Sequence, residues 1–166
     1  MSPGMQSAIV ALIFEGGDVP EGLEETGLDG LWVPANQHHA LAELLVEQGF
    51  RLYVTVVASH WLEQPASKKR PEAIPEHMQV ATVLRNPDKG ATATFSWRVK
   101  LAMDEEIDSL VDLFAGAAWQ EREQFDLVGV RFAGHPDLRR LMMSEDWVGH
   151  PLRKDYAIDT PHHPWR

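Results

Sequence analysis

The stretch Thr94-Phe95-Ser96-Trp97-Arg98-Val99-Lys100-Leu101 alternates strictly between polar and apolar side chains. Successive side chains of a β-strand point to opposite faces, so a period of two gathers the apolar residues on one face. The pattern therefore predicts a strand that packs one face against a core and turns the other toward water. It is the clearest pattern in the chain and places a β-sheet at the centre of the fold.

Further strand-forming segments lie upstream of this stretch. Residues 78–85 are predicted to form a strand, and the turn-forming residues 86–90 join it to the first stretch as an antiparallel hairpin. Residues 50–58 are rich in β-branched and aromatic side chains and predict a buried strand, and 31–33 predict a short one. The sheet therefore has at least four expected strands.

Apolar residues at helical spacing predict the helices. Gly49 is expected to end one of them in the left-handed conformation that glycine favours. The long segments 16–30 and 63–76 are expected to be loops. The expected helices run from Pro3 to an end at Gly16-Gly17, from an Asn36 cap to Gln48, from an Asp104 cap through Ile107, Leu110, Val111 and Phe114, and from Ala117 to Val128.

The order of these elements predicts an α+β fold, a two-layer sandwich with a mixed or antiparallel sheet. A chain of 166 residues fits one domain, which we place at residues 1–132. Residues 133–166 have no regular period and are expected to form an extended, partner-binding tail.

Composition excludes several classes of function. The net charge of −10 is opposite to that of a free nucleic-acid binder. The chain has no cysteine, which excludes disulfides, thiol nucleophiles and cysteine-ligated iron–sulfur clusters. The apolar run 8–14 is far shorter than the roughly 20 residues of a membrane-spanning helix, and no basic segment precedes it, so neither a span nor a signal peptide is expected there.

The densest group of unusual residues lies between positions 121 and 156. Glycine, proline, histidine, arginine and acids together do not make a packed core, so this region is either an active site or a surface shaped to fit a partner. Its three motifs are Glu121-Arg122-Glu123-Gln124-Phe125-Asp126, Gly134-His135-Pro136-Asp137-Leu138-Arg139-Arg140 and Gly149-His150-Pro151-Leu152-Arg153-Lys154-Asp155-Tyr156.

One hypothesis is a metal-dependent hydrolase in which His135 and His150 hold an ion with Asp126, Asp137 or Asp155. The two histidines are fifteen residues apart, whereas a helical metal motif places them four apart. Both precede proline, which favours extended backbone. We therefore expect them to be turn residues whose rings form hydrogen bonds.

Other residues of the region have simpler expected roles. Arg122 and Asp126 are four apart on an expected helix, which predicts a surface salt bridge. Acid–base catalysis by Glu121, Glu123 or Asp126 would need burial or pairing to separate the pKa values of two carboxyls. Outside this region, the neighbouring pair His38-His39 is expected to be solvated at a helix start.

A protein interface explains the most residues at once. Arginine and aromatic residues are enriched at interfaces, and arginine pairs well with carboxylates. The expected gripping residues are Arg139, Arg140, Arg153 and Lys154, with the aromatic residues Trp147, Tyr156 and Trp165 beside them.

The spacing of these motifs closely resembles the pattern of the 30 kDa-type subunit of NADH:quinone oxidoreductase (respiratory complex I). The resemblance covers residues 121–156, and weaker similarity extends upstream. The residues that carry it, and that it marks as partner contacts, are Glu121, Arg122, Glu123, Asp126, Gly129, Gly134, His135, Pro136, Leu138, Arg139, Arg140, Trp147, Gly149, His150, Pro151, Leu152, Arg153, Lys154, Asp155 and Tyr156.

The resemblance implies a non-catalytic structural subunit in the hydrophilic arm of a proton-translocating enzyme. Such a subunit helps to assemble the quinone-reducing module through which electrons pass from NADH to quinone. It implies no metal or cofactor on this chain, while the whole complex uses NADH, FMN, iron–sulfur clusters and quinone. It also implies contact with the large quinone-site subunit and a peripheral position on the cytoplasmic or matrix face of the inner membrane.

The same motifs leave a second complex open. Related subunits occur in membrane-bound energy-converting hydrogenases and formate hydrogenlyases, where the chain would be an equivalent scaffold. The electron donor is therefore not determined by the motifs.

Overall fold

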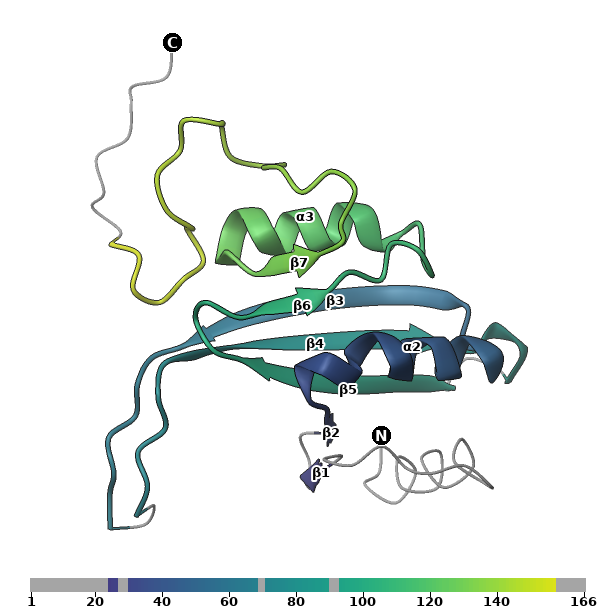
Figure 1. The fold of residues 1–166 in the computed structure, drawn as a ribbon, viewed down its shortest axis with the longest axis horizontal. Coiled ribbons are helices and arrows are strands. Elements are labelled where there is room, and N and C mark those ends of the chain that lie inside the picture. Colours follow the sequence, from purple (N-terminus) through teal and green to yellow (C-terminus); the bar gives the residue numbers. More distant parts are fainter. Residues whose placement is uncertain (1–23, 27–29, 69–70, 90–92, 158–166) are drawn as a thin grey trace.

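The computed structural model describes residues 24–26, 30–68, 71–89 and 93–157, and the helix expected to begin at Pro3 lies outside this part. Figure 1 shows the arrangement of the elements. In chain order they are β1 (Glu24–Thr26), β2 (Gly30–Trp32), a 3-10 turn (Ala35–Gln37), α2 (His38–Glu47), β3 (Leu52–Trp61), β4 (His77–Arg85), a 3-10 turn (Pro87–Lys89), β5 (Thr94–Leu101), β6 (Glu106–Asp108), α3 (Ala117–Val128) and β7 (Arg131–Ala133).

The main sheet has five strands in the order β1-β2-β5-β4-β3. The predicted hairpin is present, since β4 and β5 are antiparallel and Val80 lies opposite Val99. Strand β2 runs parallel to β5, with Leu31 opposite Trp97, whereas the other pairs are antiparallel. The sheet is therefore mixed, and the predicted α+β class is confirmed.

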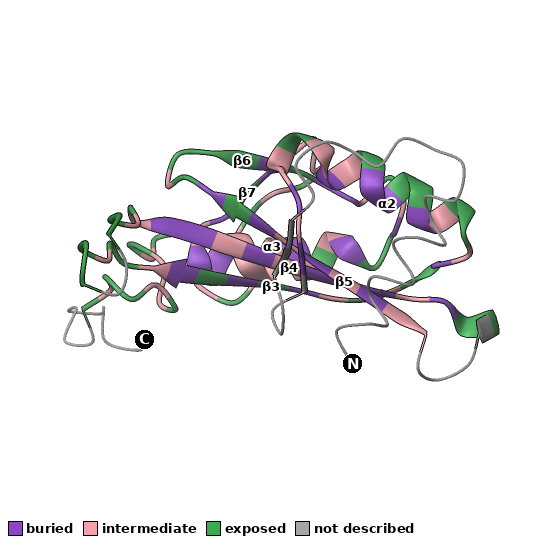
Figure 2. Ribbon diagram, turned by 90° about the horizontal axis from the view of Figure 1, so that it is seen from below, coloured by how far each residue is buried: buried purple, intermediate pink, exposed green. Residues whose placement is uncertain are grey.

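The core lies between this sheet and the helices. The apolar side chains of β5 are almost completely buried, as their alternation predicts. Figure 2 shows the buried positions as bands along β3, β4, β5 and α2. Helix α2 contributes Leu41, Ala42 and Leu45, while Leu44 is 37% exposed and belongs to the rim.

His38 is part of the core, which corrects the prediction of a solvated pair. The side chain of Trp97 is fully buried, and its indole N–H donates to Nδ1 of His38 at 2.9 Å. Burial, followed by the nearby charge of His39, lowers the pKa of His38 to about 3, so the ring stays neutral and can accept this bond. His39 faces outward and lies 2.8 Å from Asp112.

Helix α3 lies along β3, the edge strand of the sheet (Figure 1). Its glutamine side chains take the place of a neighbouring strand. The backbone N–H of Val56 donates to Gln120 Oε1 at 3.0 Å, and that of Ala58 donates to Gln124 Oε1 at 2.8 Å. Because an open edge invites pairing with another chain, these bonds both protect β3 and set the position of α3.

Three predictions about the elements differ from the structure. The helix expected from Asp104 is wrong: residues 106–108 form β6, which pairs in parallel with β7 so that Ile107 lies opposite Phe132. A strand formed with a distant partner here overrides the local helical spacing. The predicted loop 16–30 contains β1, and α2 begins at His38 without a side-chain cap from Asn36.

The helix expected from Ala117 to Val128 is confirmed at both ends as α3. Gly49 follows α2 with the expected positive φ of 90°. The segment expected as a loop at 63–76 connects β3 to β4, and Figure 1 shows its described parts, 63–68 and 71–76, projecting away from the sheet. Within the described residues, no helix has the length and apolar character needed to cross a membrane.

Neighbouring leucines of α2 test the assignment of its buried face. Leu45→Ala removes a side chain with 0% exposure and should lower the free energy of unfolding by about 3 kcal/mol. Leu44→Ala is the matched control on the 37% exposed position and should cost about 1 kcal/mol or less. Urea unfolding followed by circular dichroism measures both, and equal losses would contradict the orientation of α2.

Candidate functional site

The region singled out in the sequence is a continuous surface built on α3. After β7, residues 134–157 form no further helix or strand, and Figure 1 shows them passing back over α3. Asp126, on the last turn of α3, anchors this C-terminal segment. Its side chain has 0% exposure, and Oδ2 accepts the backbone N–H groups of Leu141, Met142 and Met143 at 2.9, 2.6 and 2.8 Å.

Arg140 completes the anchor from the other side. Its guanidinium donates to Oδ1 and the carbonyl oxygen of Asp126 at 2.7 and 3.2 Å. It also donates to the carbonyl oxygens of Trp147 and Gly149, each at 3.0 Å. A single arginine thus joins the helix end to two further turns of the segment, and its donors are directed into the protein.

Burial alone raises the pKa of the Asp126 carboxyl. The N–H of Met143, the guanidinium of Arg140 and the N–H groups of Met142 and Leu141 outweigh burial, so the pKa lies below its ordinary value. The carboxylate is therefore an anion at neutral pH and can accept hydrogen bonds from all four donors.

The predicted Arg122–Asp126 surface salt bridge is wrong. Arg122 donates to the carbonyl oxygens of Arg139 and Arg140, each at 3.2 Å, and its guanidinium lies 5.3 Å from the ring centre of Trp119. Asp126 is already surrounded by stronger donors from the C-terminal segment. Both members of the expected pair therefore hold this segment instead of each other.

The histidines act as turn residues, as expected. His135 Nε2 donates to the carbonyl oxygen of Ala118 at 3.0 Å, and Nδ1 accepts the N–H of Asp137 at 3.0 Å. His150 Nδ1 donates to the carbonyl oxygen of Asp126 at 2.9 Å. Among the described residues these rings do not gather with carboxylates into a three-ligand group, which counts against the metal-hydrolase hypothesis.

Glycines create the room that these contacts need. Gly129 ends α3 with a φ of 90°, and a Cβ there would lie 2.7 Å from the ring of His150. Gly149 has a φ of 82°, and a Cβ there would lie 3.0 Å from the ring of Tyr156. Gly129 thus lets the helix end approach the segment closely, and Gly149 lets two parts of the segment approach each other. Gly134 also has a positive φ, of 76°.

Glu121 has a structural position on the opposite face of α3. It is 1% exposed and accepts the hydroxyl of Ser109 at 2.6 Å and the N–H of Leu110 at 2.9 Å. Burial raises the pKa of its carboxyl, although these two hydrogen bonds oppose the rise. It joins α3 to the turn after β6. Glu123 is half-buried on the same helix.

The end of the segment returns to the sheet. The N–H of Leu152 donates to the carbonyl oxygen of Leu127 at 2.9 Å, and that of Lys154 donates to His60 Nδ1 at 3.2 Å. Arg153 donates to both carboxylate oxygens of Asp155, at 2.9 and 2.8 Å. No local pattern in the sequence marks His60, because 94 residues separate it from Lys154.

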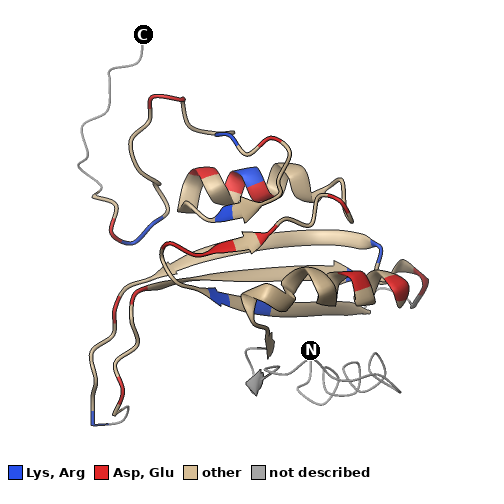
Figure 3. Ribbon diagram, viewed as in Figure 1, with Lys and Arg blue, Asp and Glu red and all other residues tan. Residues whose placement is uncertain are grey.

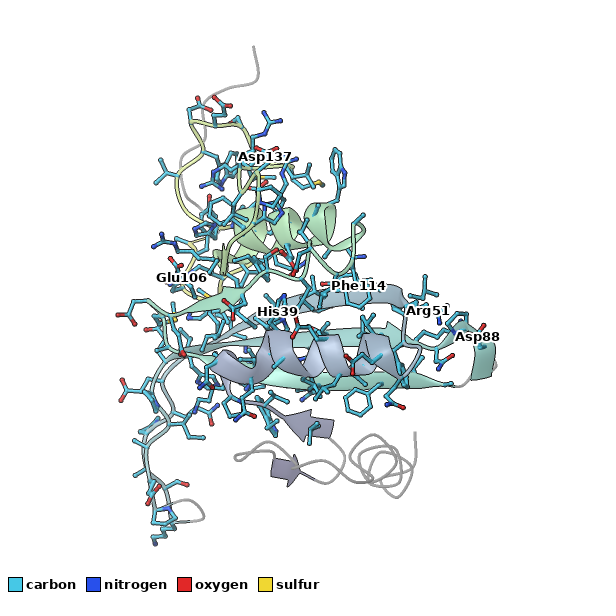
Figure 4. All side chains as sticks on the ribbon, turned by 45° about the vertical axis from the view of Figure 1, so that its right-hand side comes forward. His39, Arg51, Asp88, Glu106, Phe114 and Asp137 are labelled. Atoms are coloured by element: carbon cyan, nitrogen blue, oxygen red, sulfur yellow. The ribbon has the colours of Figure 1, made fainter. Side chains whose placement is uncertain are left out.

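The outer surface of this region carries both charged and apolar side chains. Arg139 is exposed and pairs with Asp137 at 3.0 Å. Figure 3 shows charges of both signs along α3 and the segment, and Figure 4 places Asp137 at the outer side of α3. Leu138 packs partly against the core, and Pro136 and Pro151 lie in the turns. The exposed apolar side chains are Trp119 (64%), Met142 (62%), Val148 (79%) and Leu152 (63%).

The chain is similar to known proteins over most of its length. The family described as "Respiratory-chain NADH dehydrogenase, 30 Kd subunit" matches residues 31–162. The chain belongs to this family. The resemblance stated from residues 121–156 is therefore confirmed.

Two family members illustrate the range of similarity. An NADH-quinone oxidoreductase subunit of Moorella thermoacetica is 37% identical over 152 residues, which cover 89% of this chain and 86% of the relative. An NAD(P)H-quinone oxidoreductase subunit of Synechococcus sp. (strain RCC307) is 55% identical over 72 residues, 42% of this chain and 41% of the relative. The chain thus spans less than half the length of the Synechococcus relative in the aligned part.

Solved structures share the fold. A trypsin-resistant fragment (1-134) of Nqo5 superposes with a TM-score of 0.55 at 25% identity, covering 80% of this chain and 98% of the fragment. A chain of the membrane-bound sulfane sulfur reductase, an archaeal respiratory membrane complex, superposes with a TM-score of 0.60 at 20% identity, covering 93% of this chain and 86% of that chain.

Two glycines test the close approach at the end of α3. In Gly129→Ala the new Cβ would lie 2.7 Å from the ring of His150, and the backbone φ of 90° is unfavourable for alanine. The substitution should therefore lower the free energy of unfolding by about 2 kcal/mol or more. Gly116→Ala is the control, because the φ of Gly116 is −68°, which alanine adopts readily, and no neighbouring atom lies within 4 Å of the new Cβ. Urea denaturation should find the control unchanged or slightly more stable, and equal effects would refute the packing of His150 on Gly129.

Asp126 should make the stability of the chain depend on acid. A carboxyl whose pKa is lower in the folded chain stabilises it at neutral pH, and this stabilisation is lost as the pH falls below about 4. Asp126→Asn, which leaves Arg140 without its anion, should cost about 3 kcal/mol at pH 7. Urea unfolding across pH should show the gap between wild type and variant shrinking in acid. A gap that does not change with pH would contradict the anionic anchor.

Proposed function

We propose that this chain is a non-catalytic structural subunit of the hydrophilic arm of a proton-translocating NADH:quinone oxidoreductase. In this role it helps to assemble the module through which electrons pass from NADH to quinone. Family membership supports the complex, and the use of the motif residues supports the structural role. The observation that carries the proposal is the Asp126–Arg140 anchor, in which the charged groups of the motif bind the chain's own backbone.

In this proposal, other subunits of the complex bind the redox groups. Iron–sulfur clusters are held by cysteine thiolates, and this chain has no cysteine. NADH, FMN, the clusters and quinone would then be bound elsewhere, and this chain would reach the membrane face through its partners. The proposed partner is the large quinone-site subunit.

The proposed contact surface consists of Arg139 and the exposed side chains Trp119, Met142, Val148 and Leu152. Exposed apolar groups beside arginine are typical of the centre of a protein interface. Trp119 lies on α3, and the other four residues lie in the C-terminal segment, which is held against α3. The spacing of these side chains therefore depends on the chain's own fold. An equivalent scaffold subunit of a membrane-bound hydrogenase or formate hydrogenlyase would use the same surface. The two functions differ in the large subunit that this surface binds.

Charge reversal tests the contact surface. Arg139→Glu should reduce the yield of the complex with the tagged large quinone-site subunit at least tenfold, because a partner carboxylate would then face an anion. The fold should remain, since Arg139 is exposed. Arg51→Glu is the control, because Arg51 is also exposed and Figure 4 shows it at the far end of the sheet from Asp137.

The measurement is co-expression followed by size-exclusion chromatography, with circular dichroism of each variant alone. The wild type and Arg51→Glu should elute with the partner. If the wild type and partner elute separately, the proposed function fails. If Arg139→Glu binds as well as the wild type does, the contact surface lies elsewhere.

A further inference from the structure

A second group of polar side chains lies where the C-terminal segment meets the sheet. His60 comes from β3, Glu76 from the end of the β3–β4 connection, and Asp155 from the C-terminal segment. His60 Nε2 lies 2.8 Å from Glu76 Oε1, and His60 Nδ1 lies 3.5 Å from Asp155 Oδ1. Three segments distant in the sequence thus converge on one imidazole.

We propose that His60, Glu76 and Asp155 bind one divalent transition-metal ion, for which zinc is the best match. One ring nitrogen and one oxygen of each carboxylate lie within 4.8 Å of one another. Nitrogen and carboxylate oxygen are ordinary zinc ligands, and sites with three protein ligands complete their tetrahedron with water. The site shares Asp155 with the third motif, whereas His60 and Glu76 lie outside the motifs, and it goes beyond the resemblance, which implies no metal on this chain.

The geometry allows the site to close around an ion. Zinc bonds of about 2.0–2.2 Å place neighbouring ligand atoms roughly 3.3–3.5 Å apart. Glu76 Oε1, at 2.8 Å from Nε2, must therefore move slightly outward, and ligand atoms that lie up to 4.8 Å apart must move closer. The side chain of His60 is completely buried and fixed, whereas those of Glu76 and Asp155 are 40% and 44% exposed. The two exposed carboxylates can therefore adjust their positions around an ion while the histidine stays in place.

The ring is already held in a suitable state. Its Nδ1 accepts the N–H of Lys154 at 3.2 Å and so presents a lone pair, and its Nε2 lies in hydrogen-bond contact with Glu76 Oε1 at 2.8 Å. A neutral imidazole is the form that binds metals. Metal binding gives up one of these two hydrogen bonds and gains a coordinate bond in its place.

Arg153 competes with the ion for Asp155. Its guanidinium donates to both oxygens of that carboxylate and, against the opposing effect of burial, holds the pKa of Asp155 below its ordinary value. The positive charge of Arg153 disfavours a second cation at the same group. Removing this charge should therefore strengthen metal binding, whereas it would only weaken a cluster whose role is purely structural.

The ion would join the C-terminal segment to the sheet. Because Asp155 follows the turn that carries Leu152 and Arg153, a bound ion would order the end of the segment on β3 and its connection to β4. A ligand that binds only the folded form stabilises it increasingly as its concentration rises above Kd. Zinc would thus regulate how firmly the segment is held.

Isothermal titration of the metal-stripped full chain with zinc chloride tests the site. One equivalent should bind to the wild type, and Glu76→Gln and Asp155→Asn, which change exposed groups, should each weaken it at least tenfold. Arg153→Gln should bind zinc about tenfold more tightly. His39→Gln is the matched control: His39 also faces two carboxylates, Glu43 at 3.6 Å and Asp112 at 2.8 Å, but lies outside the three-ligand group.

Amide hydrogen exchange supplies a second readout, because the chain has eight histidines that could bind zinc adventitiously. Zinc should slow exchange at residues 152–156 in the wild type and in His39→Gln, and should leave it unchanged in Asp155→Asn. Zinc that binds without slowing these amides would be adventitious. That outcome, or undiminished binding in both carboxylate variants, or weaker binding in Arg153→Gln, would overturn the proposal.

Discussion

The buried carboxylate of Asp126 is the constraint on which the functional surface depends. It is an anion with no exposure to water, so it is stable only while Arg140 and the N–H groups of residues 141–143 surround it. These donors all come from a segment without helix or strand. One side chain at the end of α3 thus determines where an otherwise irregular segment lies.

The position of α3 depends in turn on the sheet. Gln120 and Gln124 occupy the free edge of β3, and Glu121 fixes the other face of the helix to the turn after β6. The alternating strand β5 supplies the core beneath. A change in the sheet would therefore move the helix, the segment and the exposed apolar side chains together, which is what a rigid contact surface in an assembly needs.

Arginines that look equivalent in the motifs have different surroundings. Arg122 and Arg140 bind backbone carbonyls of the segment, Arg153 binds Asp155, and Arg139 points outward. Glycines at 129 and 149 are required where a ring lies against the backbone. The motifs therefore describe how the segment is folded onto α3, and only part of them is free to meet another protein of the complex.

Sequence predicted the elements whose periodicity is local and strong, above all residues 94–101 and 117–128. It failed at residues 106–108, because a strand formed with distant residue partners replaced a helix with good local spacing. The buried bond from Trp97 to His38 and the convergence on His60 join residues 59 and 94 positions apart, and no pattern along the chain marks them. The family was recognisable because its glycines, prolines and charges have fixed spacing.

Amide hydrogen exchange in the isolated chain, resolved at Leu141, Met142 and Met143, is the most direct test of the anchor. Their N–H groups donate to one oxygen of Asp126, so they should exchange far more slowly than in an unstructured peptide. If they exchange at peptide rates while the amides of α3 remain protected, Asp126 does not anchor the segment and the contact surface is not set by the chain's own fold.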